Sequence, residues 1–391
     1  MKVCFFDFTV NFGGGPQGSI YLMHRLQQKN ISCSILDAFG VSKDYKAKAE
    51  EYNLDYRILY KQLEGVTIGH NENRFLRLLG FVKQSKNFSQ VTFNLIKQIN
   101  NIKPDVLIVN NEKSLFFAYI AKLFFDFKIL LYFRGEGTKS QLTSRFIKSL
   151  NSKANHVVAH SKAAVENLIN AGVHSSNISY IPNCIDFDIN AQKSPVSNIA
   201  SYGTFKIILT AARPVKEKGY HTAVEALYRL KLKGYKIDLF LPGITPTGSD
   251  KAYENYLISL IKKLGLENSV HFIGWRDNLV TDIIASDLVI LPSHTEGFPR
   301  SIIESMINGV PVCATPVGGI PEAIIHRETG MLFDVDDVEG LENCIKELID
   351  DSSLYVSILN KAQSFSKEYF NPQHNTLGVI SILDALKGES L

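Results

Sequence analysis

The chain has 391 residues, of which 45% are hydrophobic and 21% are charged. A chain of this length predicts two compact α/β domains of similar size rather than one. The composition is that of a folded globular protein and excludes disordered, collagen-like and coiled-coil classes. The five cysteines are scattered and lack the spacing of metal ligands, which favours a reducing cytoplasm without disulfides.

The net charge of +3 is unevenly distributed along the chain. Residues 1–192 have a net charge of +8, and residues 193–391 have a net charge of −5. A basic half suits an anionic membrane surface or a phosphate-bearing acceptor, and an ordinary solvated surface explains it equally well. No apolar stretch approaches the about 18 residues that a membrane-spanning helix requires. We therefore expect a cytoplasmic protein, with peripheral contact at the inner membrane face as a further hypothesis.

The first half alternates short apolar runs with helical patterns. Its first run, residues 2–8, is interrupted by Asp7 and followed by glycines, so it predicts a strand rather than a signal peptide. Similar runs follow at residues 32–38, 105–110, 128–133, 156–160 and 178–182. Helical spacing occurs between them at residues 17–29, 114–125 and 163–172. This alternation predicts a parallel sheet with helices on both faces.

Residues 60–100 interrupt the alternation. Within them, residues 74–86 predict a helix with an apolar face that is flanked by four basic side chains: Arg74, Arg77, Lys83 and Lys86. Such a helix packs on its own domain or contacts anionic lipid.

A polar stretch at residues 191–202 predicts the interdomain linker, because it contains a proline and lacks periodicity. The alternation then resumes in a second doubly wound domain. We therefore place one domain at residues 1–192 and another at residues 203–371. The final segment, residues 372–391, has helical spacing, and we expect it to pack back on the first domain.

The strongest motif extends from Ser293 to Glu322. A strand at 288–291 leads into a short loop and then into a helix whose first turn suits Pro299. The loop therefore lies at the carboxyl end of a parallel strand, where doubly wound folds bind ligands. The carboxylate of Glu296 on this loop and that of Glu304 further down the helix can accept hydrogen bonds from a second sugar and a ribose, respectively. The alternative is that Glu296 compensates the helix dipole and Glu304 is solvated.

A second motif extends from Ala211 to Gly219, after the first strand of the second half. Arg213 and Lys218 lie on a strand-to-helix connection of the same sheet. Two cations at that position can hold a diphosphate and stabilise its charge as it leaves. The alternative is that both are ordinary surface residues.

A glycine-rich loop, Gly13 to Ser19, follows the first strand. Its glycines do not have the G-x-G-x-x-G spacing, which disfavours a dehydrogenase that binds a dinucleotide. The loop lets backbone approach a ligand closely, or it is a simple tight turn.

These motifs, in this order, resemble the retaining glycosyltransferases of family 4, the group 1 glycosyltransferases with the GT-B fold. The residues that carry the resemblance are Arg213 to Gly219, Glu296 to Glu304, Gly309 to Val312 and Gly318 to Glu322. The resemblance implies an α/β fold of two Rossmann-like, doubly wound domains that face each other across a cleft. The first would be the acceptor side, and the second would bind a nucleotide-sugar donor.

The resemblance also implies residue roles. Arg213 and Lys218 would bind the diphosphate, and Glu304 would bind the ribose. Glu296 would bind the transferred sugar, and with the two cations it makes up the expected catalytic set. The remaining donor contacts would come from backbone at Gly14, Gly15, Gly297, Phe298 and Pro299. Such enzymes need no cofactor and generally no metal, because cationic side chains and helix dipoles take its place.

The sequence departs from the family at one donor contact. Many members have a histidine after the strand that matches residues 128–133, whereas this chain has Phe133-Arg134-Gly135-Glu136. Arg134, Glu136 or His160 is then the candidate for an acceptor or sugar contact. For His160, a structural role in the core is favoured over such a contact.

The expected function is therefore transfer of a sugar from a nucleotide-diphosphate-sugar to a glycan or lipid-linked acceptor. The expected context is cell-surface polysaccharide biosynthesis (lipopolysaccharide, capsule or exopolysaccharide), with no nucleic-acid partner. One alternative is a nucleotide-sugar epimerase or hydrolase on the same plan, and another is a non-catalytic sugar-nucleotide-binding subunit.

Overall fold

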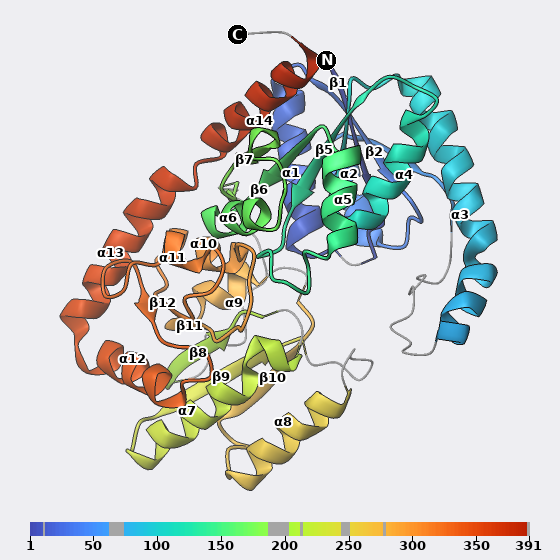
Figure 1. Cartoon of the computed structure of the whole chain (residues 1–391). Coiled ribbons are helices and arrows are strands. Elements are labelled where there is room, and N and C mark those ends of the chain that lie inside the picture. The colour runs from blue at the N-terminus through green and yellow to red at the C-terminus, as the bar shows by residue number, and fades with distance from the viewer. Residues whose placement is uncertain are drawn as a thin grey trace. The chain divides into compact units, whose positions relative to one another are not determined.

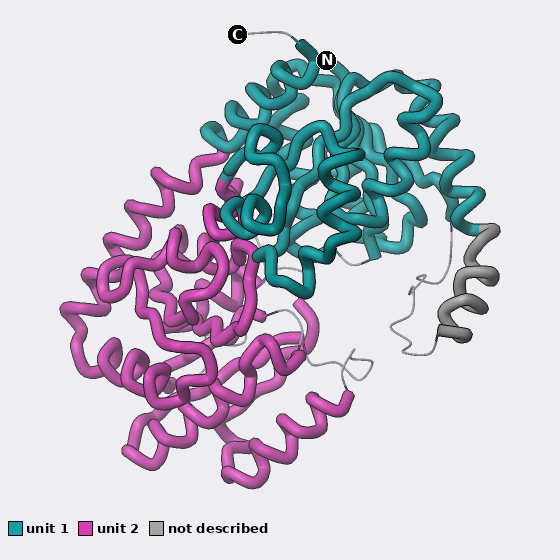
Figure 2. The backbone as a smooth tube through the Cα atoms, in the orientation of Figure 1, with its two compact units in different colours: residues 1–160, 165–181, 373–391 teal, residues 161–164, 182–372 magenta. Residues whose placement is uncertain are grey.

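The computed structural model describes residues 1–10, 12–61, 74–186, 203–211, 214–243, 251–276 and 279–388, and only the backbone of 74–86. The chain divides into two compact units, which Figure 2 distinguishes by colour. Unit 1 comprises Met1–His160, Val165–Ile181 and Gln373–Leu391. Unit 2 comprises Ser161–Ala164 and Pro182–Pro372.

Unit 1 is built on a seven-stranded sheet of order β3-β2-β1-β4-β5-β6-β7 (Figure 1). Its strands all pair in parallel: β1 (Lys2–Asp7), β2 (Ser32–Asp37), β3 (Asp55–Ile58), β4 (Val106–Val109), β5 (Lys128–Phe133), β6 (His156–Ala159) and β7 (Ile178–Tyr180). The helices between them are α1 (Gly14–Gln28), α2 (Lys43–Glu51), α3 (Arg74–Ile102), α4 (Glu112–Lys122), α5 (Ser144–Lys153) and α6 (Lys162–Asn170). A short 3-10 helix, η1 (Ser175–Asn177), precedes β7.

The last helix, α14 (Pro372–Lys387), packs on unit 1 although its sequence follows unit 2. Its Val379 and Leu383 are fully buried in the core that Ile20 and Met23 of α1 also form. Arg25 of α1 donates hydrogen bonds to two α14 side chains, at 2.8 Å to Thr376 Oγ1 and 3.1 Å to Asn375 Oδ1. Apolar burial and polar contacts therefore both hold the C-terminal helix against α1.

Unit 2 is built on a six-stranded sheet of order β10-β9-β8-β11-β12-β13 (Figure 1). Its strands also pair in parallel: β8 (Phe205–Leu209), β9 (Ile237–Pro242), β10 (Val270–Gly274), β11 (Leu288–Leu291), β12 (Val312–Ala314) and β13 (Met331–Leu332). Its helices are η4 (Lys216–Lys218), α7 (Tyr220–Leu232), α8 (Lys251–Lys263), α9 (Val280–Ile284), α10 (Arg300–Ile307), α11 (Ile320–Ala323), α12 (Val338–Asp350) and α13 (Ser352–Tyr369).

Each sheet has a point at which the strand order reverses. In unit 1 the chain builds outward from β1 to β2 and β3, then returns to the other side of β1 with β4. In unit 2 it builds outward from β8 to β9 and β10, then returns beside β8 with β11. In open parallel sheets, ligands bind beyond the carboxyl ends of the strands at such a point. A ligand site is therefore expected at the connections after β1 and β4 in unit 1, and after β8 and β11 in unit 2.

The predicted fold of two doubly wound parallel domains is confirmed. Two strands were not predicted from the sequence, and both are short. They are β3, of four residues, and β13, of two. The helix predicted at 74–86 continues to Ile102. The proposed linker at 191–202 lies outside the described residues. Pro182–Asp186 is grouped with unit 2, and Ile185 is buried in the core of that unit.

All five cysteines are buried, and none forms a disulfide. Among the helices of the described residues, none has both the length and the apolar composition needed to cross a bilayer.

Candidate functional site

The Glu296 loop, residues 292–299, joins β11 to α10 at the reversal point of the unit 2 sheet. The four residues of β11 are all buried, so the strand fixes where the loop begins. Ser293 is also fully buried, and its carbonyl accepts a hydrogen bond of 2.5 Å from Thr315 Oγ1. Ser293 Oγ in turn donates to Glu296 Oε1 at 2.8 Å. The loop is therefore tied to the sheet at its start, and the Glu296 carboxylate is oriented by it.

Lys218 reaches the same carboxylate from the neighbouring connection. It ends the 3-10 helix η4, between β8 and α7. Its Nζ lies 2.5 Å from Glu296 Oε1 and 3.3 Å from the carbonyl oxygen of Thr295. The two side chains are only 19% and 15% exposed, so water screens this ion pair less than one on the open surface. The cation and the carboxylate that the sequence predicted to share a ligand thus contact each other.

Glu304 lies on the second turn of α10 and is mostly shielded from water. Its side chain is 16% exposed, and its Oε1 is 3.9 Å from Nε of Arg300, one turn earlier. Burial raises the pKa of the Glu304 carboxyl, and the Arg300 guanidinium partly offsets this rise. The alternative of a freely solvated Glu304 does not fit this environment. The alternative that Glu296 only compensates the helix dipole is incomplete as well, because the Lys218 ammonium group is its direct partner.

The backbone of the Glu296 loop is held by contacts within unit 2. Phe298 is buried, with its ring 5.3 Å from that of Phe370, so its side chain belongs to the core. The Phe298 carbonyl accepts from Asn183 Nδ2 at 2.9 Å, and the Gly297 carbonyl accepts from the Gly319 amide at 2.9 Å. Pro299 is the N-cap of α10 in an extended conformation. These contacts leave the start of α10 at the carboxyl end of β11, where free helix amides favour an anion.

Arg213, the other predicted cation, lies outside the described residues. The glycine-rich segment is described from Phe12 onward and differs from the predicted loop. Gly13 is the N-cap of α1, and its carbonyl accepts from the Gln17 amide at 3.1 Å. Gly14 and Gly15 therefore form the first turn of α1, where their amides precede the regular helical hydrogen bonds.

Arg134 belongs to a polar cluster at the reversal point of the unit 1 sheet. Its Nη2 donates to Ser19 Oγ at 3.0 Å, and its Nε donates to Asn110 Oδ1 at 3.3 Å. Asn110 Nδ2 donates to Asp7 Oδ2 at 3.0 Å. The guanidinium also lies 5.7 Å from the ring centre of Tyr132. Arg134 is therefore held in a defined position beyond the carboxyl ends of β1, β4 and β5.

The sequence interpretation missed Asp7, Asn110 and Ser19 as members of this cluster. The available signal was that Asp7 lies near the end of one predicted strand and Asn110 ends another. Polar residues at those positions share one sheet edge when the strands are parallel neighbours.

The other two unit 1 candidates, Glu136 and His160, make contacts within unit 1. The Glu136 carbonyl accepts from Asn167 Nδ2 at 3.0 Å. His160 is 5% exposed, and its Nδ1 lies 2.9 Å from the Ile181 carbonyl oxygen. Its ring centre is 5.5 Å from that of Tyr132. This environment fits the structural interpretation of His160 better than a substrate contact.

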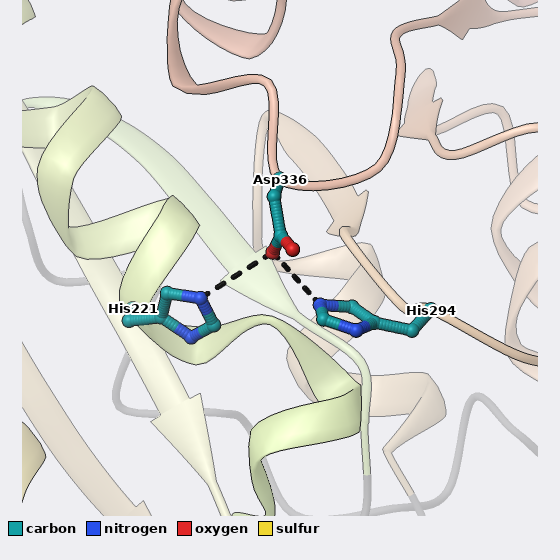
Figure 3. A group of neighbouring side chains, drawn as sticks. All are labelled: His221, His294 and Asp336. Carbon is teal, nitrogen blue, oxygen red and sulfur yellow. Dashed lines mark hydrogen bonds and ion pairs between the residues drawn. The ribbon is translucent and has the colours of Figure 1, made fainter.

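A further group of ligand-type side chains in unit 2 was not predicted from the sequence. His221, His294 and Asp336 point toward one another, as Figure 3 shows. The three residues come from three different connections and lie far apart in the sequence, so no local sequence pattern indicates that they form a cluster. The prediction that transfer needs no metal is not addressed by this geometry and stays a prediction.

Two family models match the chain in succession. "Glycosyltransferase Family 4" matches residues 12–189, and "Glycosyl transferases group 1" matches residues 196–365. Together they extend over most of both units.

Similar proteins agree with this assignment. The chain is 36% identical to N-acetyl-alpha-D-glucosaminyl L-malate synthase of Bacillus anthracis over 117 residues, 30% of this chain and 31% of that protein. It is 29% identical to the lipopolysaccharide core biosynthesis glycosyltransferase LpsE of Rhizobium meliloti over 167 residues, 41% of this chain and 46% of LpsE. The matched segments thus span less than half the length of these two curated relatives.

The crystal structure of Anabaena HepE in complex with UDP and glucose has the same architecture. It matches with a TM-score of 0.81 and 22% identity, over 98% of this chain and 100% of that chain. At this identity the likeness shows the fold alone. With the family models, the two parallel-sheet units and this fold in agreement, the chain belongs to the group 1 glycosyltransferases of family 4 and has the GT-B fold.

Proposed function

We propose that this protein is a retaining glycosyltransferase that moves a sugar from a nucleotide-diphosphate-sugar to a glycan or lipid-linked acceptor. The observation that carries the proposal is the contact between Lys218 and Glu296 at the reversal point of the unit 2 sheet, with Glu304 on the adjoining helix. Cell-surface polysaccharide biosynthesis is the proposed context, in line with the name of LpsE. A uridine nucleotide is the first donor to test, because HepE was crystallised with UDP and glucose.

The residue roles follow from charge and position. Arg213 and Lys218 would hold the diphosphate and stabilise the negative charge that develops on it as the bond to the sugar breaks. Lys218 is already placed beside the carboxylate that would bind the sugar hydroxyls, so diphosphate and sugar would occupy adjacent positions. Glu304 would accept hydrogen bonds from the ribose hydroxyls. When the donor binds, contacts from Lys218 to the diphosphate and from Glu296 to the sugar would thus replace part of the Lys218–Glu296 contact.

Retention of the anomeric configuration is proposed from the resemblance to the retaining glycosyltransferases of family 4. In a retaining transfer, the bond between the anomeric carbon and the phosphate oxygen breaks, and the acceptor oxygen bonds on the same face. The leaving phosphate would take the proton of the acceptor hydroxyl, so no protein base is required. Cationic side chains and the α10 amides would compensate the phosphate charge, and the transfer would need no metal and no cofactor.

The acceptor side is proposed to lie in unit 1. Arg134 would replace the family histidine as a contact to acceptor or sugar, because Ser19 and Asn110 hold its guanidinium beyond the strand ends. The first-turn amides at Gly14 and Gly15 are the other proposed contacts. A lipid-linked acceptor would bring the enzyme to the inner face of an anionic membrane. The basic segment at 74–86, whose side chains lie outside the described set, is the proposed contact with lipid.

The decisive experiment combines donor screening with matched variants. Purified protein is screened for thermal stabilisation by UDP, GDP, ADP and their common sugars, since a ligand selective for the folded state raises the melting temperature. Sugar transfer is then measured for Lys218→Ala and for Lys216→Ala, an exposed lysine of the same 3-10 helix. We expect loss of most activity in Lys218→Ala and near wild-type activity in Lys216→Ala. Near-normal transfer by both Lys218→Ala and Arg213→Ala would contradict the assignment.

The alternatives predict different products. An epimerase or hydrolase would convert the nucleotide-sugar without any acceptor. A non-catalytic binding subunit would show donor stabilisation without turnover, and Glu296→Ala would leave the cellular glycan unchanged.

Membrane contact has its own test. Binding to anionic vesicles should weaken as salt increases and when Arg74, Arg77, Lys83 and Lys86 are neutralised together. Unchanged binding of that variant would remove this segment from the proposal.

A further inference from the structure

Three side chains of unit 2 place ligand atoms around one point (Figure 3). Asp336 Oδ1 lies 2.8 Å from His294 Nε2 and 3.4 Å from His221 Nε2, and the three ligand atoms all lie within 4.8 Å of one another. Two atoms that bind one tetrahedral Zn²⁺ at about 2.0–2.1 Å are roughly 3.3 Å apart. The observed spacing is therefore close to that of a metal site and requires only small side-chain movements.

The ligands come from three connections at the carboxyl edge of the unit 2 sheet. His221 is the second residue of α7, which follows β8. His294 belongs to the Glu296 loop after β11, and Asp336 precedes α12 after β13. These strands are not consecutive in the chain, so one shared ligand would join connections that the backbone leaves separate. Their side chains are 17%, 25% and 54% exposed, which lets an ion reach them from solvent.

A second layer of contacts orients the imidazoles. His221 Nδ1 lies 2.7 Å from the hydroxyl of Tyr253. A proton on Nδ1 shared with that hydroxyl leaves the lone pair of Nε2 directed at Asp336, as metal-binding histidines require. The backbone amide of His294 donates to the Glu217 carbonyl at 2.8 Å, which fixes its loop against η4.

We propose that His221, His294 and Asp336 form a site for one divalent transition-metal ion of the Zn²⁺ class, with water in the remaining coordination position. Two imidazole nitrogens and one carboxylate suit Zn²⁺ or Co²⁺, whereas Mg²⁺ and Ca²⁺ prefer oxygen ligands. The ion would clamp η4 and the Glu296 loop to the connection before α12. Its role is structural, and the inference does not rest on the proposed transfer reaction.

The test is direct metal binding by the full chain after treatment with a chelator. Zn²⁺ binding is measured by calorimetry, and Co²⁺ binding is followed by its visible absorption. We expect one ion per chain and at least about ten-fold weaker binding in His294→Gln and in Asp336→Asn, with a loss of similar size in Tyr253→Phe. Adventitious binding to thiols is limited, because all five cysteines are buried.

His271 supplies the matched control. Its Nε2 lies 2.8 Å from Asp238 Oδ1 in the same unit, the same separation as in the His294–Asp336 pair. Because that pair is not part of the three-ligand group, His271→Gln should bind Zn²⁺ like the wild type.

Melting temperatures with and without Zn²⁺ separate loss of the site from loss of the fold. The wild type and His271→Gln should be stabilised by the ion, and a folded His294→Gln should not. If the chelated wild type binds no stoichiometric Zn²⁺, or if His294→Gln and Asp336→Asn bind as tightly as the wild type, the triad is a hydrogen-bonded network and the proposal is overturned.

Discussion

Gly318 lies just before α11 and supports the Glu296 loop at very close range. Its φ of +55° is in the left-handed region, which favours glycine. A Cβ atom added there would lie 1.7 Å from the Glu296 carbonyl oxygen, far inside van der Waals contact. That contact is with backbone, so it cannot be relieved by rotating a side chain. We predict that Gly318→Ala displaces the Glu296 loop and destabilises unit 2.

Gly309 permits this steric effect to be separated from backbone strain. It has a φ of +71°, but its Cβ would meet nothing closer than 3.5 Å, at Leu359 Cδ2. The left-handed conformation costs alanine about 1–2 kcal/mol at either position. Overpacking adds about 1–3 kcal/mol at position 318 alone. Gly318→Ala should therefore unfold roughly 2–12 °C below Gly309→Ala, since 1 kcal/mol shifts the melting temperature of a unit this size by about 2–4 °C.

Both variants are compared with the wild type by differential scanning calorimetry. Donor-induced stabilisation, measured in the same scans, should be lost in Gly318→Ala and kept in Gly309→Ala, because only the former moves Glu296. Equal melting temperatures for the two alanine variants would refute the steric reasoning. Full donor stabilisation of Gly318→Ala would refute the link between this glycine and the Glu296 loop.

Three further predictions concern side-chain contacts. Lys218→Met leaves the Glu296 carboxylate partly buried without its cation, which should cost about 1–3 kcal/mol in chemical denaturation, and adding Glu296→Gln should recover part of it. Because burial raises the pKa of Glu304, ionisation opposes folding. Glu304→Gln should therefore unfold at a higher temperature than the wild type at neutral pH. This difference in melting temperature should disappear below the ordinary carboxyl pKa, where Glu304 is protonated in both the folded and the unfolded state. A difference that grows on acidification would contradict an upward pKa shift of Glu304. Arg25→Ala removes two hydrogen bonds to α14, so residues 372–387 should exchange amide hydrogen faster by mass spectrometry, and unchanged protection would count against this anchoring role.

The sequence predicted the alternation of strands and helices because most of the strands are short apolar runs that end at polar or glycine residues. β4 and β11, whose residues are all buried, are examples. Two short strands escaped this pattern. β13 has only two residues, too few for a periodic signal, and β3 contains charged Asp55 and Arg57 at a sheet edge. Edge strands carry polar residues because one side of the strand faces solvent.

The helix start at Gly14 was not predictable from glycine content. Three successive glycines are typical of a loop, since glycine is a poor helix former. The structure nevertheless begins α1 there, with the Gly13 carbonyl accepting from Gln17. Tertiary packing of Ile20, Met23 and Leu26 against the sheet outweighs the local preference.

By itself, the sequence determined which connections carry polar side chains beyond the strand ends, because that depends only on local periodicity. It placed Lys218 after one strand and Glu296 after another. The tertiary structure alone decided that β8 and β11 are neighbours, which brings Nζ and Oε1 to 2.5 Å across 78 residues of sequence. The tertiary structure also brings Arg134 to Ser19, and it brings His294 to His221 and Asp336. Strand order sets these contacts, and it is fixed by the packing of the whole sheet rather than by any single segment.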